Sequence, residues 1–136
     1  MSLLPGMITT TSHPDVPERN VLGEVAPLGA SYSSGYQTVS IPADAKNATL
    51  TFWYRPGSEA TSGDFQRSML LNADYSYLAT VMKVLESATE WRWWVFDLTP
   101  YRGRSIVIYW EVFNDDRLAG PRTWMFVDDV SVQVCK

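Results

Sequence analysis

The stretch TWMFVDDVSVQVC, residues 123–135, decides the fold and poses the main question about this sequence. It is almost entirely apolar and rich in residues that favour β-strands, yet two adjacent carboxylates, Asp128 and Asp129, lie in its middle. Consecutive side chains of a strand point to opposite faces, so these two cannot both enter one apolar layer. We expect one aspartate to face solvent and the other to turn towards the edge of a β-sandwich.

Short β-prone segments fill most of the chain before this strand. Gly, Pro, Asn and Asp separate them, which is typical of an all-β sandwich or barrel. Residues 78–88 have near-helical apolar spacing, but their β-branched residues and short length favour a strand. The sequence predicts strands over 35–42, 48–56, 65–72, 77–85, 91–98, 104–113 and 123–135.

Length and composition indicate one globular domain. The chain has 136 residues, of which 46% are hydrophobic and 19% charged, and its formal net charge is −4. It contains no run of Lys and Arg, which argues against a nucleic-acid partner. No segment is long and apolar enough to span a bilayer, and the start lacks the pattern of a signal peptide. Residues 1–30 are rich in Pro, Gly, Ser and Thr, and we expect a flexible arm or linker with at most one short strand.

The scarcity of His and Cys limits the chemistry that the chain can perform. His13 and Cys135 are the only residues of their kinds, so an internal disulfide and a Cys/His zinc site are excluded. A catalytic triad or Cys–His pair would need His13, which lies in the segment expected to be mobile coil. The sequence therefore predicts a protein without enzymatic activity. The role of Cys135, a free thiol or a linkage site, stays open.

The alternation divides each strand into an inner and an outer set of side chains. The inner set, which we expect to fill the core, is Leu50, Phe52, Tyr54, Trp94, Phe96, Leu98, Ile106, Ile108, Trp110, Met125 and Val127. The outer set is unusually apolar for a face expected to meet water. It comprises Trp53, Trp93, Val95, Val107, Tyr109, Trp124 and Phe126.

These outward aromatics predict a contact surface, because large exposed apolar patches tend to mark binding sites. A neighbouring domain, a second copy of the chain, or residues 1–30 folded back would each cover such a face. Alternatively, the rings stack on the C–H faces of a sugar while adjacent polar side chains bond its hydroxyls. A register slip of one residue would exchange the two faces. The candidate ligand-binding residues are Trp53, Trp93, Tyr109, Trp124, Arg55, Arg92 and Glu111.

Several pieces of the sequence resemble one family of domains. They are YQTVSIPADAKNATLTFWYR at 36–55, the turn from Trp91 through FDLTPYRGRSIVIYWEV, and FVDDVSV at 126–132. Together they are similar to bacterial jelly-roll domains of the galactose-binding-like group, which includes MAM-like domains and carbohydrate-binding modules. The resemblance covers roughly residues 30–134, and its most specific piece runs from Trp91 to Gly103.

This resemblance implies a non-catalytic module attached to a secreted or cell-surface protein. It also implies a structural calcium candidate, because related modules use an Asp at the position of Asp129, the second Asp of DDV. The usual N-terminal FE-G opening, whose Glu helps to bind that ion, is absent here. The alternative is that Asp129 accepts backbone N–H bonds and braces a loop. Asp128, Asp115 and Asp116 are weaker metal candidates, and the last two also suit a solvated turn.

The sequence thus predicts an all-β fold over residues 31–136, a jelly-roll β-sandwich of two antiparallel sheets. We expect an extracellular or cell-surface interaction module that contacts other domains of its parent, or a second copy, through the aromatic face. A carbohydrate-binding module that stacks sugars on outward Trp and Tyr is the alternative. A glycoside hydrolase is a remote one, since adjacent carboxylates on one strand do not form the required divergent pair.

Overall fold

The computed structural model describes residues 2–3, 6–9, 18–115 and 120–136. Nearly all regular structure in these ranges is β-strand. No helix within them is long and apolar enough to cross a membrane. The only helical element described is a short 3-10 turn, η1 (Thr99–Tyr101). The strands are β1 (Ser2–Leu3), β2 (Gly6–Thr9), β3 (Ser31–Ser40), β4 (Asn47–Ser58), β5 (Phe65–Asn72), β6 (Tyr77–Val84), β7 (Arg92–Asp97), β8 (Ser105–Asn114) and β9 (Thr123–Cys135).

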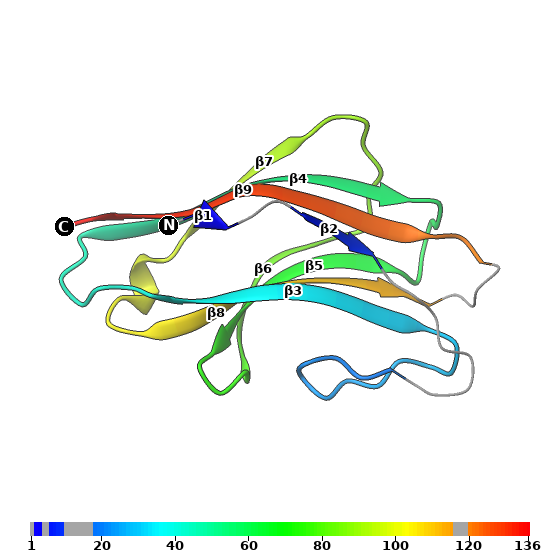
Figure 1. The fold of residues 1–136 in the computed structure, drawn as a ribbon, viewed down its shortest axis with the longest axis horizontal. Coiled ribbons are helices and arrows are strands. Elements are labelled where there is room, and N and C mark those ends of the chain that lie inside the picture. The colour runs from blue at the N-terminus through cyan, green and yellow to red at the C-terminus, as the bar shows by residue number, and fades with distance from the viewer. Residues whose placement is uncertain (1, 4–5, 10–17, 116–119) are drawn as a thin grey trace.

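The strands form two antiparallel sheets stacked face to face (Figure 1). The first sheet has the order β1-β9-β4-β7, with β2 also paired to β9, and the second has the order β3-β8-β5-β6. This arrangement confirms the predicted jelly-roll β-sandwich. Every strand expected from residue 31 onwards is present, including β6, which had the helix-like spacing. The described residues before position 31 include two short strands, β1 and β2, and the boundary between arm and domain stays a prediction.

The core lies between the sheets and contains the side chains that the alternation predicts. Leu50, Phe52 and Ile108 are fully buried there, and Trp94 and Phe96 pack against them while staying partly exposed. Since apolar area removed from water drives folding, this shared layer holds the sheets together. The inner set named from the sequence is confirmed in full.

The Asp pair marks a β-bulge in β9. Thr51 of β4 lies opposite Ser131, but Trp53 lies opposite Asp128, so β9 carries one extra residue between these pairs. Asp129 has a positive φ of 51°, the left-handed conformation that Asp tolerates better than most residues. Asp129 is exposed, as expected for one member of the pair, and Asp128 is half-buried.

The bulge resets the alternation of β9. Val127 and Val130 are three residues apart, yet both are buried in the core. An unbroken strand would point them to opposite faces. The single inserted residue therefore lets both ends of the strand keep their apolar side chains inward.

Part of the outer aromatic set is buried, which corrects its expected exposure. Val107 and Tyr109 point away from the core on β8, but Leu22 packs over them, and Tyr109 is only 1% exposed. Burial raises the pKa of the Tyr109 phenol to about 12. In Figure 1 the segment before β3 lies against the outside of the second sheet. Of the covers considered for the outer face, the one found at this sheet is the described part of the N-terminal region, through Leu22.

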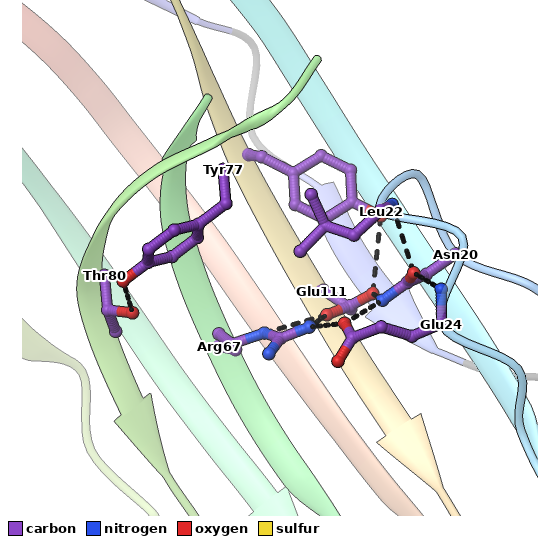
Figure 2. A network of polar contacts seen from close by, with 8 residues as sticks. Asn20, Leu22, Glu24, Arg67, Tyr77, Thr80 and Glu111 are labelled. Atoms are coloured by element: carbon purple, nitrogen blue, oxygen red, sulfur yellow. Dashed lines mark hydrogen bonds and ion pairs between the residues drawn. The ribbon is translucent and has the colours of Figure 1, made fainter. Parts of the chain in front are cut away.

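A buried ion-pair network holds residues 18–30, the N-terminal segment, on the second sheet (Figure 2). Arg67 of β5 pairs with Glu111 of β8, and its Nε lies 2.9 Å from Oε2 of that carboxylate. The Asn20 amide donates to Glu111 and to Glu24, each over 2.8 Å. The hydrogen bond from Asn20, and then Arg67, lower the pKa of Glu24 despite its partial burial. Glu111 is fully buried, so its predicted role as a surface ligand is wrong.

Replacing Arg67 by Met should lower the free energy of unfolding by about 3–5 kcal/mol, because it leaves the Glu111 carboxylate buried without its cation. Urea unfolding measures this loss. Limited proteolysis should also show faster cleavage within residues 18–30, which lose their anchor.

The matched control is Arg92→Met. Arg92 forms an ion pair with Glu86 in which both side chains are more than one third exposed, so its loss should cost about 1 kcal/mol or less. An equal loss in the free energy of unfolding for the two variants would contradict the importance of the buried network.

The bulge is tested at Asp129. The change to Val should destabilise the chain by about 1–2 kcal/mol, since a β-branched residue is strained at positive φ. Asp129→Gly should leave the stability unchanged or raise it. Thermal and urea unfolding would measure the stability of both variants. If Asp129→Val is as stable as Asp129→Gly, the result would argue against the bulge.

Candidate functional site

The outer face of the first sheet carries a group of exposed tryptophans. Trp53 of β4 lies directly opposite Trp93 of β7, and their ring centroids are 5.0 Å apart at an angle of 51°. Trp91, just before β7, lies on the same face, where it borders one hollow with Trp53 and contacts Phe126. All three indoles are exposed, Trp93 to 49%. We call Trp53, Trp91 and Trp93 the tryptophan face.

A shallow hollow of about 290 Å³ lies within this face. It is lined by Trp53, Trp91, Asp128 and Asp129. The bulge of β9 explains the two carboxylates, because it places Asp128 beside Trp53 and adds Asp129 at the same point of the strand. The Asp129 backbone N–H donates to Asp128 Oδ1 over 2.7 Å, which ties the pair together. Two ring faces and two carboxylates thus meet at one place on the surface.

Arg55 lies at one side of the tryptophan face. Its guanidinium carbon lies 4.6 Å from the Phe126 ring centroid and 5.7 Å from that of Trp91. A guanidinium over aromatic rings is attracted by their negative faces. Trp91 and Phe126 are themselves in edge contact, with centroids 6.3 Å apart. The contacts orient the Trp91 ring, which is otherwise on the loop leading into β7.

Trp124 lies at the far end of the same face and is half-buried. It pairs with Gly57 of β4, and a Cβ built on that glycine would lie only 2.0 Å from the indole. The ring therefore packs directly on the glycine backbone. The buried Gln66 amide donates to the carbonyls of both Gly57 and Trp124, over 3.1 and 3.0 Å. This side chain of the second sheet fixes the two strands where the ring rests.

The structure separates the remaining predicted ligand residues from this face. Arg92 lies opposite Tyr54, an inner residue, and pairs with Glu86 at the sandwich edge. It alternates with Trp93 and so cannot serve the same face. Tyr109 and Glu111 belong to the second sheet and are buried under the N-terminal segment. Of the seven predicted ligand residues, the structure brings together Trp53, Trp93, Trp124 and Arg55.

Two residues of this face were missed by the sequence reasoning, Trp91 and Phe126. The signal for Trp91 was present in WRWW, since alternation places the first and third residues of that run together. Phe126 was assigned outward but not to a site. Its role depends on β9 lying next to β4, a pairing that the sequence does not show.

The donor set around the Asp pair does not fit a calcium cage. Calcium takes about 6–8 oxygen ligands. Across the described ranges, no group of three or more His, Cys, Asp or Glu side chains could hold a metal ion. Asp115 approaches Gly63, and its backbone N–H donates to Asp64. Asp116 lies outside the described residues.

No family model matches the sequence, and no curated protein matches it. The fold is similar to that of TmCBM61, a carbohydrate-binding module solved in complex with β-1,4-galactotriose. The TM-score is 0.53 at 17% sequence identity, and the match covers 79% of this chain. It spans 66% of that module's length. The chain therefore has the jelly-roll fold of such modules.

A second match is the enzymatically active domain of the tailspike protein 4 of bacteriophage CBA120. Its TM-score is 0.47 at 14% identity, and it covers 94% of this chain but 18% of that one. At this TM-score the match does not establish a common fold.

The packing of Trp124 is tested at Gly57. Gly57→Ala should displace the indole and lower the free energy of unfolding by about 1–3 kcal/mol, because the new methyl group overlaps the ring. Urea unfolding and near-ultraviolet circular dichroism would report both effects. The control Gly35→Ala, with nothing within 4 Å of the added Cβ, should cause no loss. A Gly57→Ala variant with unchanged stability and spectrum would contradict the close approach.

Proposed function

We propose that this chain is a carbohydrate-binding module whose tryptophan face stacks on sugar rings. Exposed indoles offer flat apolar surfaces to the C–H faces of a sugar. Asp128 and Asp129 are placed beside two of them to accept hydrogen bonds from its hydroxyls. The observation that carries the proposal is this meeting of exposed Trp rings and carboxylates in one hollow. As the family resemblance implies, such a module would work outside the cell or on its surface.

The fold supports this function over contact between proteins as the primary role. TmCBM61 has the same architecture and was solved with a galactotriose. Its low sequence identity relates the folds alone, so the ligand does not follow from the match. Galactan is nevertheless a sensible first probe, with other polysaccharides beside it.

A protein partner is the second candidate function. Val95 extends the tryptophan face and is 55% exposed, although it has neither a ring to stack nor a polar group to bond a hydroxyl. An apolar patch that continues past the hollow suits another domain of the parent protein or a second copy. Sedimentation tests the second copy as partner, because self-association through this face would raise the measured molecular mass.

Glycoside hydrolysis fits the Asp pair less well. The reaction uses two carboxylates on opposite sides of the scissile bond, separated by about 5 Å or more. Asp128 and Asp129 are adjacent on one bulge and line the same side of the hollow. Binding without catalysis is the function that this placement supports.

Replacing Trp53, Trp91 or Trp93 singly by Ala should weaken glycan binding about tenfold or more, because each change removes an exposed ring from the tryptophan face. A glycan array would identify the ligand, and affinity electrophoresis or calorimetry would then measure each variant.

The control is Tyr77→Ala on β6 of the other sheet, a ring of similar exposure that should leave binding unchanged. Retention of the folded protein on no polysaccharide would contradict the proposal. Wild-type self-association abolished by Trp93→Ala, without glycan binding, would instead favour the protein partner.

A further inference from the structure

We propose, resting on the carbohydrate-binding function above, that the hollow selects sugar residues with a free amino group. The predicted occupant is a glucosamine-type unit of a cationic polysaccharide, such as deacetylated chitin. The choice follows from the charge of the hollow, because both charged residues that line it, Asp128 and Asp129, are acidic.

The two carboxylates have no neutralising partner near them. Among the described residues, neither Asp128 nor Asp129 forms an ion pair with Lys or Arg. The hydrogen bond between them uses one carboxylate oxygen of Asp128 and the backbone N–H of Asp129. Asp129 is exposed at the bulge, so its carboxylate meets whatever enters the hollow.

Arg55 is a cation on this face, but its guanidinium contacts aromatic rings. It lies over the rings of Phe126 and Trp91, and no ion pair joins it to the Asp pair within the described residues. Because two carboxylates and one guanidinium lie on this face, the net charge around the hollow is negative. The net charge of −4 over the whole chain has the same sign.

An ammonium group complements this lining in two ways. It forms charge-assisted hydrogen bonds with the carboxylates, which are stronger than those from a neutral hydroxyl. A cation is also attracted to indole rings, and Trp53 and Trp91 line the same hollow. A uronate would meet like charge and be repelled. The volume, about 290 Å³, is at the small end of ligand sites and suits a single sugar unit.

The test compares chitosan and chitin oligosaccharides of equal length, which differ only in whether the amine is free or acetylated. At low salt, wild type should bind the chitosan about tenfold more tightly, and the preference should shrink as salt rises. Polygalacturonate should bind most weakly.

Asp128→Asn and Asp129→Asn should each reduce the preference for the free amine. Asn keeps the acceptor for the backbone N–H and tolerates positive φ, so both variants should fold. The control Asp44→Asn removes the same charge from an exposed turn where Asp44 contacts Lys136. It should leave the preference intact.

Equal binding of both oligosaccharides, or an equal effect of Asp44→Asn, would overturn the amine preference. If neutral glycans then bind in a Trp53-dependent way, the carbohydrate-binding function stands and the inference alone fails. If no glycan binds at all, both fail. The inference would be established if the tenfold preference for chitosan over chitin oligosaccharides is lost in Asp128→Asn but kept in Asp44→Asn.

Discussion

The one-residue bulge of β9 is the constraint on which the candidate site depends. β9 pairs with β1 and β2 on one side and β4 on the other, so any change of its register changes the whole first sheet. Val127 and Val130 can both reach the core only if one residue between them is left out of the alternation. Burial of these side chains thus forces Asp128 and Asp129 onto the outer side, where the indoles lie.

The outer faces of the two sheets differ in how far they are covered, and the outer face of the first sheet is exposed around Trp93. The second sheet carries apolar side chains around Tyr109 that Leu22 covers, and the Arg67–Glu111 pair secures the covering segment. Because Glu111 is fully buried, separating the segment from the sheet would expose a network that is satisfied only when it is closed. The first sheet has no such cover over Trp93 among the described residues. The exposed indoles Trp53, Trp91 and Trp93 therefore gather on the face where the carboxylates also lie.

Much of the site follows from alternation, and the rest depends on strand neighbours. Trp53 and Trp93 could be assigned outward from the sequence, as could Tyr109, because the assignment needs only the period of two. That period says nothing about which outward residues share a sheet, so Tyr109 was grouped with the two indoles by error. The grouping of Arg92 with the indoles was wrong for a simpler reason. Arg92 is adjacent to Trp93 in β7, so its side chain points to the opposite face of the sheet. The calcium assigned to Asp129 came from the family resemblance, and the local donor set does not support it.

The sequence by itself determined the strands, the inner side chains such as Phe52 and Ile108, and the lack of a Cys/His metal site. These are properties of neighbouring residues, set by covalent geometry and by the preference of apolar side chains to leave water. Only the tertiary structure decided that β4 lies between β7 and β9, that residues 18–30 cover Tyr109, and that Asp129 is a bulge residue. Those outcomes depend on contacts between segments far apart in the chain. Their free energy comes from the packing of two whole layers, which no local pattern of residues records.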